Sequence, residues 1–279
     1  MTDGIGVAED AITVALAQHR VEAGHVEANV DRAVEAIEHA ATEGADLVCL
    51  PEMFNVGYFA FDSYAREAEG LDGPTLDRIG DIAAEHGVAV QAGSIVEDLE
   101  ASAAAGFSTP EPSGLANASV FLGRAGDVRA VYRKQHLFGY DSAETRLLTP
   151  GESLPTVEFA GFTVGMTTCY DLRFPELYRE LANEGVSLVL VPSAWPYPRV
   201  EHWQTLPRSR AIENLAYVAA VNGAGEMGDD QLVGRSTVYD PWGTPVATSD
   251  DDPALVTAEI APSRVDAVRE EFPALRDRR

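Results

Sequence analysis

Residues 162–176 have the sequence FTVGMTTCYDLRFPE, in which an apolar, strand-like run passes directly into the start of a helix. The run ends at Cys169, and Pro175 suits the first turn of a helix. A thiol at such a turn is exposed and lies near backbone amides, which lower the pKa of a thiol and bind oxyanions. Cys169 is therefore a candidate nucleophile, although a buried structural cysteine fits its position equally well.

Apolar runs alternate with amphipathic stretches on both sides of this turn. The predicted strands are 11–18, 46–52, 88–96, 117–123, 128–133, the paired runs around Gly161, 187–193, 216–222 and segments around 234–239 and 254–260. The predicted helices are 25–44, 76–86, 176–184 and 201–214, and the charged tail is predicted to be partly helical. Residues 100–116 are small and aperiodic, which predicts a surface loop. This alternation indicates an α/β layered fold.

The composition fits one large core. The chain has 279 residues, of which 46% are hydrophobic, and its apolar runs continue without a break, so we predict one domain over 1–279. No run approaches the ~18 apolar residues of a membrane-spanning helix, and the acidic start lacks the features of a secretory signal. We therefore expect a cytoplasmic protein without a membrane partner. The second cysteine, Cys49, lies in the apolar run DLVCLP, which indicates a buried structural residue.

The charge is strongly negative. There are 45 Asp and Glu against 20 Lys and Arg, a net charge of −25, so binding to nucleic acid is not expected. This acidic excess is typical of adaptation to concentrated salt, where screening reduces self-repulsion. Lys134 is the one lysine, the other basic residues being arginine. Its retention indicates a role for a compact ammonium that a planar guanidinium cannot fill.

Two kinds of base could activate Cys169. His136 and His202 lie among polar and aromatic residues and permit a Cys–His pair. Glu52 ends a buried strand, where α/β folds place functional groups, although a helix cap or turn is the commoner role there. The chain has no C-x-x-C motif and no histidine pair at ligand spacing, so neither a metal nor a cofactor is predicted.

Three motifs in chain order resemble the nitrilase superfamily of carbon–nitrogen hydrolases: LPEMF (50–54), YRKQHLF (132–138) and CYDLRFPE (169–176). The resemblance continues through SAW (193–195), 201–222 and GRSTVYDPWG (234–243), and so covers nearly the whole chain. The motif CYDLRFPE is similar to that of the branch that contains ω-amidase and the Nit proteins.

The resemblance implies a role for each residue of a catalytic set. Glu52 matches the family's general base, Lys134 its oxyanion-stabilising lysine and Cys169 its nucleophile. Glu144, seven residues before the glycine of LLTPG, best matches a second glutamate of the family. The backbone N–H of Tyr170 would hold the oxyanion together with Lys134.

Four further residues are candidates for substrate binding, with ordinary packing as the alternative for the aromatic ones. They are Phe54, Tyr58, Arg173 and Trp195. Arg173 would bind a substrate carboxylate through two parallel hydrogen bonds, or else pair with Asp171 or Glu176 and stabilise the turn.

The resemblance also implies an activity and an assembly. The leading hypothesis is an ω-amidase-like cysteine amidase that releases ammonia from a small aliphatic amide through a thioester. A nitrilase and an N-carbamoyl amino acid hydrolase are the alternatives in the same class, and a non-catalytic binding or scaffold protein is the alternative in another. The implied fold is a four-layer α-β-β-α sandwich that pairs with a second copy. A homodimer or higher homo-oligomer is expected, in which the tail (about 262–279) contacts a partner subunit.

Overall fold

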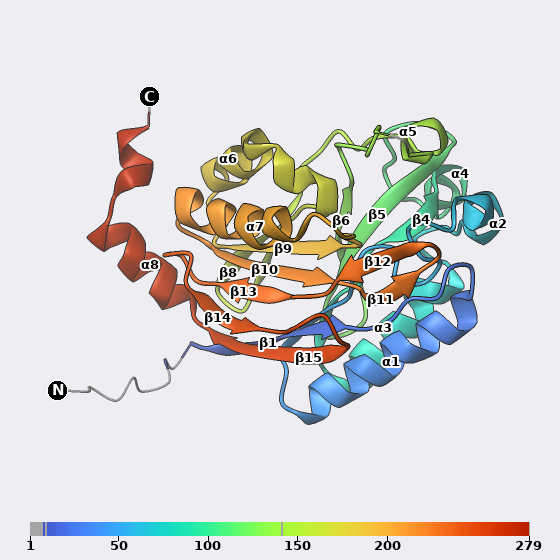
Figure 1. Cartoon of the computed structure of the whole chain (residues 1–279). Coiled ribbons are helices and arrows are strands. Elements are labelled where there is room, and N and C mark those ends of the chain that lie inside the picture. The colour runs from blue at the N-terminus through green and yellow to red at the C-terminus, as the bar shows by residue number, and fades with distance from the viewer. Residues whose placement is uncertain (1–7, 9, 141, 279) are drawn as a thin grey trace.

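Two mixed β-sheets pack face to face with helices on both outer faces (Figure 1). This computed structural model describes residue 8 and residues 10–140 and 142–278. The first sheet has the order β15-β1-β2-β3-β5-β4, with β6 paired to β5. Its strands are β1 (Ile12–Gln18), β2 (Leu47–Cys49), β3 (Ala89–Gln91), β4 (Ile95–Asp98), β5 (Leu115–Leu122), β6 (Val128–Arg133) and β15 (Ala254–Ile260).

The second sheet has the order β14-β13-β10-β9-β8-β7. Its strands are β7 (Thr156–Phe159), β8 (Phe162–Met166), β9 (Leu188–Ser193), β10 (Tyr217–Asn222), β13 (Thr237–Tyr239) and β14 (Pro245–Thr248). A separate hairpin consists of β11 (Ala224–Met227) and β12 (Asp230–Val233). In each sheet the central strands are parallel: β2 lies between β1 and β3, and β9 lies between β8 and β10.

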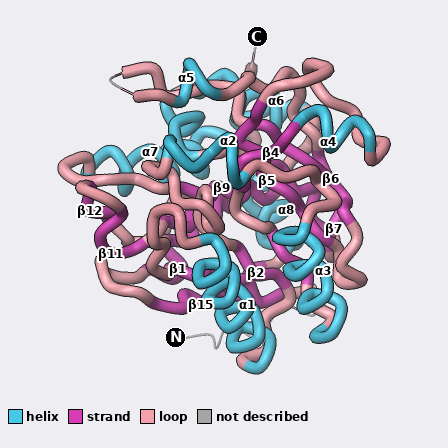
Figure 2. The backbone as a smooth tube through the Cα atoms, turned by 90° about the vertical axis from the view of Figure 1, so that its right-hand side faces the viewer, coloured by secondary structure: helices cyan, strands magenta, loops and turns pink. Residues whose placement is uncertain are grey.

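The helices complete the layers. They are α1 (Val26–Thr42), α2 (Tyr64–Glu67), α3 (Pro74–His86), α4 (Leu99–Ala104), α5 (Glu144–Leu147), α6 (Pro175–Asn183), α7 (Val200–Asn214) and α8 (Pro262–Glu271), with short 3-10 turns at Phe61–Ser63, Cys169–Arg173 and Ala274–Asp277. Figure 2 shows α1 and α3 side by side over the first sheet, and α6 and α7 pack on the second. None of these helices is long and apolar enough to cross a membrane.

The side-chain alternation of the strands explains the two-sided packing. Along β1, Val14 and Leu16 face the core between the sheets, whereas Ala15 and Ala17 face α1. Cys49 is fully buried between the two sheets, as expected for a structural cysteine. The observed α-β-β-α layers confirm the fold predicted from the resemblance.

Three local predictions were wrong. The segment 88–96 is two strands, because the chain turns at Gly93 (φ +39°), where a Cβ would lie 2.0 Å from the carbonyl oxygen of Pro51. Part of the predicted loop 100–116 belongs to α4, whose N-terminus is capped by the Asp98 carboxylate. The short strands β11, β12 and β14 were missed, because each has only 4 residues and none has a continuous apolar run or a clear alternation.

The C-terminal tail is partly helical, as predicted. Val265 and Val268 of α8 are buried against the body of the molecule. After α8 the chain runs away from the sandwich (Figure 1), and the ring of Phe272 is about half exposed at 51%. Its contact with a partner subunit stays a prediction, and residue 279 lies outside the described residues.

Candidate active site

Cys169 lies on a sharp turn between β8 and α6. Its φ is +46°, in the left-handed region that residues with a Cβ rarely adopt. The buried carboxylate of Asp171 holds the turn by accepting the N–H of Thr168 at 3.0 Å and the hydroxyl of Tyr132, on β6, at 2.6 Å. Because Lys134 directly follows β6, these bonds hold Cys169 beside the lysine.

Lys134 forms a buried ion cluster with two glutamates. Its Nζ donates to Oε1 of Glu52 at 2.9 Å, and to Oε1 and Oε2 of Glu144 at 2.9 and 3.1 Å. The side chains of Lys134, Glu52 and Glu144 are all 0% exposed. In the sequence Glu52 lies 82 positions before Lys134 and Glu144 lies 10 positions after it, and the structure brings all three together. Such a cluster is tolerated in the interior because each charge is paired and hydrogen-bonded.

Other donors also bond to the oxygens of the two glutamates. Glu52 accepts the side-chain amide of Asn117 at 2.9 Å on Oε1 and the N–H of Ala194 at 3.0 Å on Oε2. Oε2 of Glu144 accepts the hydroxyl of Tyr58 at 3.0 Å and the N–H of Phe138 at 2.6 Å. These bonds fix both carboxylates in place beside the lysine.

The charges of the cluster set the protonation of the site. Burial raises the pKa of Glu52, with a contribution from Glu144, and Lys134 opposes the rise. Burial alone would lower the pKa of Lys134, but Glu144 and Glu52 outweigh it and raise that pKa well above its usual value. Lys134 therefore stays charged.

The prediction of a lowered thiol pKa was wrong. Burial and the neighbouring Glu52 raise the pKa of Cys169 well above its usual value, and Lys134 offsets only part of the rise. The residue is 9% exposed, rather than open to solvent as expected from its position in the sequence. In the resting site the thiol therefore keeps its proton, so its attack on a substrate requires a base.

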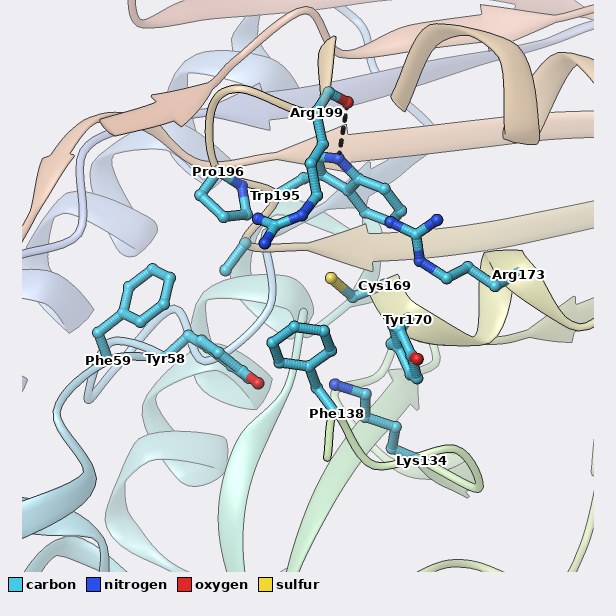
Figure 3. Close-up of a pocket in the computed structure, with 11 residues that line it drawn as sticks. Tyr58, Phe59, Lys134, Phe138, Cys169, Tyr170, Arg173, Trp195, Pro196 and Arg199 are labelled. Carbon is cyan, nitrogen blue, oxygen red and sulfur yellow. Dashed lines mark hydrogen bonds between the residues drawn. The ribbon is translucent and has the colours of Figure 1, made fainter. Parts of the chain in front are cut away.

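The Cys169 thiol and the Lys134 ammonium both reach a cavity between aromatic rings and two guanidinium groups (Figure 3). The cavity is lined by Tyr58, Phe59, Lys134, Phe138, Cys169, Tyr170, Arg173, Ala194, Trp195, Pro196 and Arg199. Three of the residues predicted to bind substrate, Tyr58, Arg173 and Trp195, are therefore at the cavity.

The structure does not bring Phe54 to the cavity. Its side chain is 0% exposed and packs in the core between the first sheet and its helices. The left-handed backbone of Met53 (φ +50°) follows Glu52, so the chain turns between the Glu52 carboxylate and the phenylalanine. Phe54 supports the loop from inside the protein.

Arg173 is held by aromatic rings and not by a carboxylate. Its guanidinium carbon lies 4.9 Å from the ring centre of Trp195 and 5.6 Å from that of Tyr170. Both terminal nitrogens lie 3.3 Å from Nδ1 of His202. The alternative pairing with Asp171 or Glu176 is absent from the ion pairs of the described residues.

Neither histidine considered as a base lies at the cavity. His136 stacks on Phe174 with ring centres 3.6 Å apart, and its Nδ1 lies 3.0 Å from Oδ1 of Asp171. His202 contacts Arg173, and no histidine is among the residues that line the cavity. The geometry therefore favours Glu52 over a Cys–His pair.

We expect Glu52→Gln to lower kcat by about 10³-fold, while a His136→Ala/His202→Ala double variant loses less than about tenfold. Glutamine cannot accept a proton, and its NH₂ group would face the donors Lys134, Asn117 or Ala194. The kcat of both variants is measured by steady-state ammonia release. An inactive double variant beside an active Glu52→Gln would instead support the Cys–His pair.

The described residues contain no group of three or more His, Cys, Asp and Glu side chains arranged to hold a metal ion. The site is instead defined by Cys169 on a strand-to-helix turn, the buried Glu–Lys–Glu cluster and the two-sheet fold around them. The chain belongs to the carbon–nitrogen hydrolase family, the nitrilase superfamily, whose family model matches residues 13–270.

Within this family the chain is similar to amidases. It is 36% identical over 239 residues to the 2-oxoglutaramate amidase of Paenarthrobacter nicotinovorans (84% of this chain, 79% of the relative). It is 34% identical over 261 residues to the omega-amidase NIT2 of Homo sapiens (90% and 89%). These relatives confirm the resemblance to the ω-amidase branch.

A solved structure adds chemical information. An amidase from Nesterenkonia sp. AN1 superposes with a TM-score of 0.83 at 26% identity, covering 99% of this chain and 97% of the other. That structure is of a variant with the acetamide moiety of fluoroacetamide added covalently at the active-site cysteine. A family member of the same fold therefore uses a cysteine in its active site.

Several residues of the site were not predicted: Asn117, Phe138, Ala194 and Arg199. Asn117 carried a usable signal, because it is an amide within β5, a strand that is otherwise almost entirely apolar and buried. A polar side chain in such a strand requires buried partners. Ala194 acts through its backbone N–H, so its residue type carries no signal.

Proposed function

We propose that this protein is an amidase that hydrolyses the terminal amide of a small aliphatic substrate and releases ammonia through a thioester on Cys169. The observation that carries the proposal is the buried Lys134, held between Glu52 and Glu144 and sharing a cavity with the thiol. The amidase names of the similar proteins support the same reaction. Arg173 is proposed to bind a carboxylate at the far end of the amide.

The first step forms the carbon–sulfur bond. Glu52 takes the thiol proton as sulfur attacks the amide carbon, and the π electrons of the carbonyl move to its oxygen. Lys134 and the backbone N–H of Tyr170 are proposed to stabilise this oxyanion, at roughly 3–4 kcal/mol per donor in comparable sites. The raised pKa values of Glu52 and Cys169 suit a base that takes the proton only during attack.

The second step expels ammonia and the third adds water. Glu52 passes its proton to the amide nitrogen, the carbon–nitrogen bond breaks and the acyl group stays on sulfur. Water then attacks the thioester while Glu52 takes its proton and returns one to sulfur, which frees the acid and restores the thiol. Glu144 would keep Lys134 charged and oriented throughout.

A substrate panel tests this assignment in multimolar KCl, the condition that the acidic composition favours. Ammonia release is measured from short ω-amides, the matching nitriles and N-carbamoyl amino acids. We expect the amides to give the highest kcat/KM. Faster turnover of nitriles or carbamoyl compounds would reassign the protein to that activity. No turnover by folded protein would support a non-catalytic role.

A further inference from the structure

Arg199 shares the cavity with Arg173 but comes from a different element. It directly precedes α7, and its carbonyl oxygen accepts the indole N–H of Trp195 at 3.0 Å and the N–H of Trp203 at 3.1 Å. Its guanidinium carbon lies 5.9 Å from the ring centre of Phe138. Figure 3 shows the guanidinium groups of Arg199 and Arg173 on opposite sides of the Cys169 thiol in this view.

The two guanidinium groups have no acidic partner in the part of the chain that the structure describes. Neither has a carboxylate within ion-pair distance among the described residues, although the chain has 45 acidic and 20 basic residues. No Asp or Glu is among the described residues that line the cavity, and the third cation there, Lys134, is paired with two glutamates. Partly buried cations without counterions are costly, so this cavity is built to receive a negative group.

We propose that Arg199 is a specificity-determining residue that binds the substrate carboxylate together with Arg173, one guanidinium from each side. This inference rests on the proposed attack of Cys169 at the amide end of the same molecule. A carboxylate has two oxygens and about four acceptor positions, which is enough to accept hydrogen bonds from both guanidinium groups. A neutral amide of equal length would form neither ion pair, so the second arginine increases the preference for acidic ω-amides.

Paired substrates test the role of Arg199. Succinamate and 4-oxopentanamide have the same amide and chain length, but the second carries a methyl ketone in place of the carboxylate. We expect Arg199→Gln to lower the preference for succinamate by about 10–100-fold, mainly through its KM. For Arg199→Lys, which keeps the charge but not the planar guanidinium, we expect a preference for succinamate between those of the wild type and Arg199→Gln. Arg129→Gln, an equal charge change at an exposed residue of β6 outside the cavity, is the control.

A binding measurement decides the same question without turnover. Succinate should protect Cys169 from iodoacetamide, and the concentration for half protection should rise at least about tenfold in Arg199→Gln but not in Arg129→Gln. The inference is overturned if Arg199→Gln leaves both the substrate preference and the protection unchanged, or weakens both substrates equally. Protection that depends on Arg199, in a protein that does not turn over amides, would overturn the proposed function but not this inference. Turnover of amides in which Arg199→Gln changes neither the substrate preference nor the protection would overturn this inference alone.

Discussion

Replacing Cys169 with alanine is expected to lower kcat for amide hydrolysis by about 10⁴-fold or more, to the background of the assay. The sulfur forms the bond on which every later step depends, and Glu52 and Lys134 cannot replace it. The variant should still fold, because it loses one small atom group and keeps the ion cluster. Ammonia release and thermal unfolding, measured on the same preparation, test both statements.

Cys49→Ala is the matched control for this variant. Cys49 is 0% exposed between the two sheets, and burial raises the pKa of its thiol, so it takes no part in chemistry at the cavity. We expect unchanged kcat and a loss of about 1–2 kcal/mol in the free energy of unfolding from the cavity left behind. Retained turnover in Cys169→Ala, or its loss in Cys49→Ala, would contradict the assignment of the nucleophile.

The second large effect is expected from Lys134→Met, which should lower both activity and stability. Removing the ammonium leaves Glu52 and Glu144 buried beside each other without a cation. Breaking a buried pair in this way typically costs about 3–5 kcal/mol. Loss of the oxyanion donor should lower kcat by at least about 10²-fold. Lys134→Arg should keep more stability than Lys134→Met yet lose most activity, because a planar fork does not match the space of an ammonium.

The stability loss in Lys134→Met should depend on pH in a defined direction. Burial and the nearby Glu144 raise the pKa of Glu52 in the folded state above its unfolded value, and without the lysine nothing opposes this rise. The folded variant then binds more protons than the unfolded chain, so its free energy of unfolding falls as pH rises above about 4.3. The slope is at most about 1.4 kcal/mol per pH unit for each proton.

Denaturant unfolding of the wild type and Lys134→Met from acid to neutral pH gives the difference in their free energies of unfolding at each pH. The gap in the free energy of unfolding between the two proteins should widen from acid to neutral pH and then level off once Glu52 ionises in the folded variant. A variant as stable as the wild type at neutral pH, or a gap independent of pH, would show that Lys134 does not compensate the buried carboxylates.

Features that depend on local sequence were predictable. The position of Cys169 after an apolar strand and before Pro175 indicated the turn on which it lies. The preceding strand made Glu52 a candidate and the composition singled out Lys134, but the roles expected of both came from the motif resemblance. The motif resemblance was needed for Glu144, because its short helix α5 has no periodic pattern of its own.

Features that depend on tertiary burial were not predictable. The pKa of Cys169 rises because the whole site is enclosed and Glu52 faces the thiol, and neither fact is visible in the order of residues. Phe54 follows Glu52 closely, yet the backbone turn at Met53 directs its ring into the core. Arg199 reaches the cavity from the start of α7, which only the packing of that helix on the second sheet reveals.

Mass spectrometry of the wild-type protein, quenched during turnover of succinamate, tests the central claim most directly. We expect an adduct on the peptide that contains Cys169, with the mass of the acyl group after loss of ammonia. It should be absent from Cys169→Ala and disappear when substrate is exhausted. An adduct that keeps the amide nitrogen, or an adduct on another residue, would contradict a thioester on Cys169. So would ammonia release that continues in Cys169→Ala while the wild type shows no adduct on Cys169.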